Sequence, residues 1–199
     1  MLLGVIIPIY NERELLPRLI ERLDRTPRPK DSQGLALTRH IFLVDDGSTD
    51  GTQDLLAELG RREGITTLIA DLNTGKGSAL RRGFAAALKQ GCDLVIVQDA
   101  DLEYDPADHD NALAPLIDGR ADAVIGTRFL GETHRVLYFW HSVVNRAITT
   151  LSNMLSNLTL TDIECGTKAF TRPTLEILGP RLTENRFGIE PEMVAKLAK

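Results

Sequence analysis

Short apolar runs alternate along the chain with longer stretches in which apolar residues recur every three or four positions. The short runs predict buried strands, because they are rich in Val, Ile and Leu and are bounded by polar residues or glycine. They are Leu2–Ile9, His40–Val44, Ile65–Ala70, Leu94–Val97 and Ala123–Ile125. The longer stretches have the spacing of a helix with one buried face. They are Glu12–Asp24, the segment after Asp50 that carries Leu55, Leu56 and Leu59, Ser78–Gln90 and Asn111–Ile117.

This alternation of strand and helix predicts an α/β fold with a mostly parallel sheet flanked by helices. In such a sheet the carboxyl ends of the strands lie along one edge, where ligands bind. The chain places polar and glycine-rich clusters at those ends, at residues 10–12, 45–48, 73–77 and 99–101. We therefore expect a ligand site built from these four clusters.

The pattern changes after Gly126. Apolar residues at helical intervals predict a long amphipathic helix over Tyr138–Asn157, then a short helix near Pro173–Leu178 and a final helical segment, Ile189–Lys199. Residues 161–170 are assigned no regular element. The final segment stops without a cap residue or a helix breaker, which favours a chain that is a piece of something longer.

The composition is that of a single globular domain over residues 1–199, with 43% hydrophobic and 26% charged residues. A formal net charge of −5 argues against a dedicated nucleic-acid-binding protein, which needs a basic face. The two cysteines, Cys92 and Cys165, favour a reducing, cytoplasmic setting with structural thiols. No stretch predicts a signal peptide or a membrane-spanning helix.

The sequence Asp99-Ala100-Asp101 directly follows a predicted buried strand. In an extended chain, residues two apart point to the same side, so Asp99, Asp101 and Glu103 are expected to converge on one cation. Carboxylate oxygens suit Mg²⁺ or Mn²⁺, whose other ligands would be water and a diphosphate. Two acids after a strand also fit a solvated loop, and it is the neighbouring clusters that favour the metal site.

A second cluster, residues 44–51, follows the second predicted strand. Its Asp46 is suited to accept hydrogen bonds from a ribose hydroxyl or from the N–H groups of a base. Ser48, Thr49 and Asp50 are instead expected to cap a turn and the next helix. Asp50 and Gln53 have the spacing of a capping box.

Two more clusters have two interpretations each. Tyr10 is placed to lie against a base and Glu12 to accept ribose hydroxyls, although Glu12 also suits the positive end of the following helix. Residues 73–78 hold two glycines and Lys76, which fits either phosphate binding at a helix start or a simple loop. The spacing of a P-loop is absent.

Charged residues later in the chain are further candidates for the site. Arg128 follows the fifth predicted strand, within reach of the same edge, and is suited to neutralise phosphate. Asp162, Glu164 and Lys168 form a mixed-charge cluster, for which structural ion pairs are the alternative explanation. The histidines are His40, His109, His134 and His141. Their spacing matches no metal site.

Taken together, these clusters resemble family-2 glycosyltransferases of the GT-A fold. The similarity is greatest to polyprenyl-phosphate sugar transferases of the dolichol-phosphate mannosyltransferase type. The matching stretches occur in the family's order over residues 1 to about 170, and are Ile7–Glu12, Val44–Thr52, Asn73–Gly77, Asp99–Leu102 and Gly126–Phe129.

The resemblance implies that residues 1–126 bind a UDP- or GDP-linked sugar and that residues 127–199 line the acceptor side. Carried over by position, the nucleoside would be held by Pro8, Tyr10, Glu12, Val44 and Asp46. The metal and diphosphate would be organised by Asp99, the Ala100 backbone, Asp101 and Glu103, and Arg128 would bind phosphate. Asp162 and Lys168 match a segment on the acceptor side.

The implied reaction is an inverting hexose transfer that depends on Mg²⁺ or Mn²⁺, with Asp101 and Arg128 as catalytic residues and a polyprenyl phosphate as acceptor. The helix over residues 138–157 matches an element that such enzymes lay against a membrane. Two features depart from the family: Glu103 stands where relatives often have Gln, and relatives continue past residue 199 into a basic loop.

Two other functions stay open at this point. A sugar-phosphate nucleotidyltransferase uses a similar sheet and paired acids, but usually begins with a glycine-rich loop, and residues 8–12 contain no glycine. A non-catalytic nucleotide-sugar-binding module would fit the abrupt end of the chain.

Overall fold

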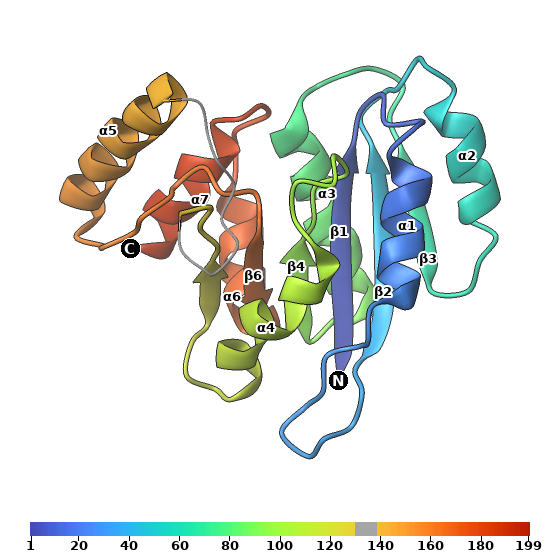
Figure 1. Cartoon of the computed structure of the whole chain (residues 1–199), viewed down its shortest axis with the longest axis horizontal. Helices are drawn as coiled ribbons and strands as arrows, with labels where there is room; N and C mark the ends of the chain where they lie inside the picture. Colours follow the sequence, from blue (N-terminus) through green and yellow to red (C-terminus); the bar gives the residue numbers. More distant parts are fainter. Residues whose placement is uncertain (130–138) are drawn as a thin grey trace.

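The computed structural model describes residues 1–129 and 139–199. Within them a six-stranded sheet, in the order β3-β2-β1-β4-β6-β5, is covered by helices on both faces (Figure 1). The strands are β1 (Leu2–Ile9), β2 (Thr38–Asp45), β3 (Ile65–Ile69), β4 (Leu94–Val97), β5 (Ala123–Ile125) and β6 (Lys168–Thr171). The helices are α1 (Leu16–Arg25), α2 (Thr52–Leu59), α3 (Lys76–Gln90), α4 (His109–Ile117), α5 (Phe139–Ser156), α6 (Arg172–Leu178) and α7 (Ile189–Leu197), with 3₁₀ turns η1 (Pro106–Asp108) and η2 (Gly179–Arg181).

The sheet confirms the α/β prediction and all five predicted strands. β1 pairs in parallel with β2 and β4, and β2 pairs in parallel with β3, so Ile9, Asp45 and Ile69 end at one edge. The sequence pattern misses β6, which lies antiparallel between β4 and β5. Because β6 runs the other way, it begins where its neighbours end, with Lys168 opposite Ile125. The residues just before β6 are thereby brought to the expected ligand edge.

Two hydrophobic cores lie on opposite faces of the sheet. Alternate residues of β1, such as Val5 and Ile7, pack with α1, α2 and α4. Ile6 points to the other face, where it packs with α3, α6 and α7 through residues such as Phe84 and Met193. This is the three-layer arrangement expected when helices connect parallel strands.

The predicted helices are all present, with boundaries that shift by a few residues. α1 begins at Leu16 rather than at Glu12, whose carbonyl accepts a hydrogen bond from the Leu16 N–H at 2.9 Å in the preceding turn. The long amphipathic helix is confirmed as α5. Its predicted first residue, Tyr138, lies outside the described residues, as does His134.

The predicted capping box at the start of α2 is wrong. Gly51, with a φ of 90°, occupies the N-cap position that the capping box assigns to Asp50. The Asp50 carboxylate accepts a hydrogen bond from the Thr52 N–H at 3.0 Å within the turn. Gln53 donates instead to the buried carboxylate of Asp45 at 3.1 Å, because a buried anion needs the donor more than the exposed helix end does.

α5 buries polar residues and exposes apolar ones, which is the reverse of an ordinary surface helix. Its buried residues are Asn145 and Thr149, both polar. Its exposed apolar residues, which we call the α5 apolar face, are Phe139, Trp140, Val143, Val144, Ile148, Leu151, Met154 and Leu155. No described residue of α5 joins either hydrophobic core, and among the described helices none is long and apolar enough to cross a membrane.

Candidate active site

A cavity of about 880 Å³ opens at the edge where β1, β2, β4 and β5 end. Its lining brings together most of the predicted site residues, namely Pro8, Tyr10, Glu12, Asp46, Lys76, Asp99, Ala100, Asp101, Glu103 and Arg128. Val44, Asp162 and Lys168 do not line it, because their side chains are buried behind its wall. The cavity is also lined by Tyr104, Arg186, Phe187 and Glu190, to which no motif in the sequence points.

One side of the cavity is strongly acidic. Burial raises the pKa of Glu12, and the negative charges of Asp101, Asp50 and Asp99 raise it further. The part of this rise that comes from the neighbouring carboxylates marks a surplus of anionic oxygen. Such a surplus is the environment that attracts a hard divalent cation.

The expected convergence of Asp99, Asp101 and Glu103 on one cation is not present in this arrangement. In residues 1–129 and 139–199, no group of three Asp, Glu, His or Cys side chains is placed to hold a metal ion. The backbone is the reason: the chain turns at residues 100–101 and Leu102 has a φ of 61°, so the alternation of an extended strand does not continue to Glu103. Asp101 Oδ1 instead accepts a hydrogen bond from the Glu103 N–H at 2.9 Å.

Lys76 joins the acidic side of the cavity to a buried charge pair. Its Nζ lies 2.8 Å from Asp99 Oδ1 and 3.1 Å from Glu190 Oε1. Burial alone would lower the pKa of Lys76, but the two carboxylates raise it above its ordinary value. Lys76 therefore stays cationic and neutralises Asp99.

Lys168 does not line the cavity, although the resemblance implies a place on the acceptor side. It is fully buried at the start of β6, where it forms an ion pair with Glu190 behind the cavity. A side chain in that position supports Glu190, and through it Lys76, rather than lining an acceptor path.

Asp46 holds the glycine-rich loop before α3. Its carboxylate accepts hydrogen bonds from the Gly75 N–H at 2.6 Å and from the Thr74 hydroxyl and N–H at 2.9 and 3.1 Å. Only 3% of Asp46 is exposed. Most of its acceptor capacity is used by the loop, and its contact with a ribose or base stays a prediction.

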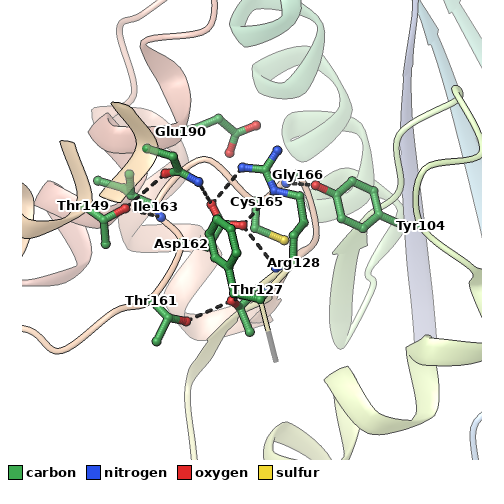
Figure 2. A network of polar contacts seen from close by, with 12 residues as sticks. Tyr104, Thr127, Arg128, Thr149, Thr161, Asp162, Ile163, Cys165, Gly166 and Glu190 are labelled. Carbon is green, nitrogen blue, oxygen red and sulfur yellow. Dashed lines mark hydrogen bonds and ion pairs between the residues drawn. The ribbon is translucent and has the colours of Figure 1, made fainter. Parts of the chain in front are cut away.

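Arg128 reaches the cavity from the end of β5 and is held from behind by Asp162 (Figure 2). The Asp162 carboxylate accepts hydrogen bonds from Arg128 Nε at 2.7 Å, Nη2 at 2.9 Å and the backbone N–H at 3.1 Å. Burial would raise the pKa of Asp162, but hydrogen bonds from Arg128 and Asn145 bring it below its ordinary value. This two-pronged pairing fixes the plane of the guanidinium group. Asp162 thus orients Arg128. It does not line the cavity, although the resemblance implies a place on the acceptor side.

The loop between η2 and α7 closes one side of the cavity with Arg186 and Phe187. It packs against the start of α3 so closely that a Cβ on Gly75 or on Gly77 would lie 2.4 Å from one of its carbonyl oxygens. The two glycines of the 73–78 cluster were therefore a signal of close backbone approach. The sequence does not show which segment approaches them, which is why Arg186 and Phe187 were missed.

The family model for glycosyl transferase family 2 matches residues 4–178, and all four strand-end clusters fall within that range. The chain belongs to glycosyl transferase family 2. This confirms the resemblance drawn from the clusters. Arg186, Phe187 and Glu190 lie beyond the matched residues.

The names of two curated relatives include a polyprenyl lipid. The polyprenol monophosphomannose synthase of Mycolicibacterium smegmatis is 33% identical over 176 residues, which cover 86% of this chain and 62% of that protein. The undecaprenyl-phosphate 4-deoxy-4-formamido-L-arabinose transferase of Proteus mirabilis is 29% identical over 177 residues, which cover 88% of this chain and 50% of that protein. The chain thus spans between half and two thirds of the length of these relatives.

A solved structure has the same fold. Glucosyl-3-phosphoglycerate synthase from Mycobacterium tuberculosis, in complex with Mn²⁺, UDP and glucosyl-3-phosphoglycerate, superposes with a TM-score of 0.66 at 20% identity. The match covers 94% of this chain and 62% of that one. This similarity confirms the predicted GT-A fold.

Proposed function

We propose that this chain transfers a hexose from a nucleotide-diphosphate sugar to a polyprenyl phosphate, with inversion at the sugar and with Mg²⁺ or Mn²⁺ bound. The observation that carries the proposal is a single cavity that joins an acidic side, at Glu12, Asp99 and Asp101, to the cations Lys76 and Arg128. A diphosphate held by a divalent cation and an anionic acceptor together require both kinds of surface. Family membership and the relatives named for polyprenyl carriers support this assignment.

In this proposal, residues 1–126 hold the donor and residues 127–199 hold the acceptor. Tyr10 is 46% exposed at the cavity and offers its ring to the base. Glu12 accepts the ribose hydroxyls, and the nucleoside is enclosed by Pro8, Asp46 and the backbone at Val44. Lys76 binds the diphosphate.

The donor set of the acidic side suits a hard divalent cation, because carboxylate oxygens are its preferred ligands, and burial together with the nearby charges of Asp101, Asp50 and Asp99 raises the pKa of Glu12. Asp99 and Asp101 would hold the ion. When bound, it stabilises the negative charge that develops on the departing nucleoside diphosphate.

Arg128 binds the phosphate of the acceptor. Its guanidinium group is already oriented by Asp162, so binding a phosphate costs little further ordering. A phosphate acceptor is itself an anionic nucleophile, and the chain then needs no strong general base beside it.

We further propose that the α5 apolar face rests on a lipid surface at the cytoplasmic side of a membrane, where a polyprenyl phosphate resides. Phe139 and Trp140 stand at one end of this face, with ring centroids 5.1 Å apart and exposures of 71% and 73%. Such rings favour the boundary between headgroups and acyl chains. The free thiols of Cys92 and Cys165 agree with a reducing compartment.

Donor binding is tested by thermal unfolding with UDP-glucose, UDP-GlcNAc and GDP-mannose, each with Mn²⁺ and with EDTA. A donor at about 100 times its Kd should add about 2.7 kcal/mol, a rise in Tm of about 5–10 °C for a chain of this length. Asp101→Asn should abolish the Mn²⁺-dependent rise. Asp108→Asn, an exposed carboxylate in the same region but outside the cavity, should retain it.

Transfer is then measured to a short polyprenyl phosphate in detergent micelles. Sugar transfer that requires both Mn²⁺ and Asp101 is the expected result. Donor binding without transfer or donor hydrolysis would instead favour a binding module, and release of pyrophosphate from a nucleoside triphosphate and a sugar phosphate would favour a nucleotidyltransferase.

Lipid contact is tested by co-sedimentation with vesicles of phosphatidylcholine and phosphatidylglycerol. Leu151→Glu, on the α5 apolar face, should weaken binding about tenfold or more, since burying one leucine is worth about 1.5–3 kcal/mol. Ile177→Glu on α6, where the isoleucine is also exposed, should leave binding unchanged. Equal loss in both variants would contradict a role specific to α5.

A further inference from the structure

α5 is joined to Arg128 by an unbroken chain of hydrogen bonds. Asn145 Nδ2 donates to Asp162 Oδ1 at 2.8 Å. Asp162 in turn binds the Arg128 guanidinium group, as Figure 2 shows. One turn further along α5, the Thr149 hydroxyl donates to Asn145 Oδ1 at 3.1 Å and accepts from the Ile163 N–H at 3.2 Å. The chain runs from the helix with the outward apolar face to the wall of the cavity.

The Asp162 carboxylate is saturated by these contacts. A carboxylate offers about four acceptor positions, and the two oxygens of Asp162 receive three bonds from Arg128 and one from Asn145. Of these four donors, the one from Asn145 does not belong to Arg128 itself. It fixes the rotation of the carboxylate, and the carboxylate fixes the guanidinium plane.

The chain is also shielded from water. The exposed fractions of Asn145, Thr149 and Asp162 are 3%, 4% and 1%. Water has little access to replace a lost bond there, so each bond must be made within the protein. Hydrogen bonds are directional, unlike apolar contacts, so a rotation or shift of α5 is transmitted to Asp162 rather than absorbed.

We propose that Asn145 is a positioning residue for Arg128. Through Asp162 it orients the guanidinium group toward the cavity, so that the placement of α5 sets the affinity for a phosphate bound by Arg128. The identity of that phosphate, the polyprenyl acceptor, rests on the proposed function, whereas the orientation of Arg128 does not.

The orientation is tested without substrate, by NMR of the ¹⁵N-labelled full chain. The Arg128 Nε–H signal, assigned by its loss in Arg128→Lys, should exchange slowly with solvent because it donates to a buried carboxylate. Asn145→Ala should accelerate this exchange about tenfold, equivalent to about 1.4 kcal/mol. Thr150→Ala is the matched control, because Thr150 is exposed on the same helix and its hydroxyl donates back to the Arg146 carbonyl.

A second variant keeps the test decisive if Asn145→Ala does not fold. Thr149→Val keeps the side-chain shape and removes the hydroxyl that supports Asn145, so it should give a smaller acceleration in a folded protein. Circular dichroism and Tm verify folding in each case. Exchange at the wild-type rate in both Asn145→Ala and Thr149→Val would overturn the proposal.

Kinetics separate positioning from general loosening. Asn145→Ala should raise KM for a polyprenyl phosphate in micelles about tenfold and leave KM for the donor within about twofold. Equal increases in both constants would refute a specific action on Arg128. Absence of any transfer by the wild type would instead refute the proposed function, while the exchange measurement would still decide the role of Asn145.

Discussion

Gly77→Ala separates local helix preference from the packing that builds the cavity. Gly77 lies in the first turn of α3, where alanine is the better helix former by about 1 kcal/mol at most. The added Cβ, however, would lie 2.4 Å from Glu184 O and 2.9 Å from Asn185 C. These are backbone atoms, which cannot rotate away as a side chain can.

The size of the effect follows from that distance. Ordinary contact begins at 3.4 Å, so the loop between η2 and α7 must retreat by about 1 Å. Overpacking of this kind costs about 1–3 kcal/mol, and the gain in helix preference offsets part of it. We expect a net loss of about 1–2 kcal/mol, or a fall in Tm of about 2–8 °C. Arg186 and Phe187 retreat with the loop, so the rise in Tm caused by donor should shrink as well.

Thermal unfolding with and without a saturating nucleotide sugar measures both effects. Gly179→Ala is the matched control, because its Cβ would meet nothing within 4 Å. That variant should unfold at the wild-type temperature or slightly above it. A Gly77→Ala protein with unchanged or raised Tm and an undiminished donor response would refute the claim that this contact shapes the cavity.

Two further predictions concern buried ionisable side chains, Lys76 and His109. Lys76→Met removes the cation between Asp99 and Glu190, so it should cost about 1.5–3 kcal/mol, and Mn²⁺ should raise its Tm more than that of the wild type; equal responses to Mn²⁺ would contradict this account. Burial lowers the pKa of His109 to about 4, so the unfolded chain binds the proton first and the stability present above pH 6.5 is lost as the pH falls toward 4. The Tm of His109→Gln should therefore fall less over that interval than the Tm of the wild type or of His141→Gln, a change at an exposed position.

Most of the fold could be predicted from the period of apolar residues, because five of the strands contain short, mostly apolar runs separated by helical stretches. β6 could not. Its four residues begin with Lys168 and include only two apolar side chains, Ala169 and Phe170. Whether such a segment forms a strand depends on the neighbours it finds, here β4 and β5, rather than on its own composition.

The site was predictable where it depends on topology alone. Parallel strands bring their carboxyl ends together, and this places Glu12, Asp46 and Asp99 around one cavity. The partners of each side chain were not predictable, because they depend on loops that are remote in sequence. Asp162 is the clearest case: the resemblance implies an acceptor-side residue and its charge also fits a structural ion pair, but its burial beside Arg128 depends on the path of the chain into β6.

α5 shows the same division between period and direction. An amphipathic pattern predicts a helix with two unlike faces, but it does not say which face meets the protein. Here the polar residues at positions 145, 149 and 153 turn inward, and Asn153 exchanges two hydrogen bonds with the backbone of Leu160. An apolar face left in water lowers stability, and a lipid surface would remove that penalty. Because the opposite face of the same helix holds Asp162, membrane contact and the orientation of Arg128 would be two consequences of one placement of α5.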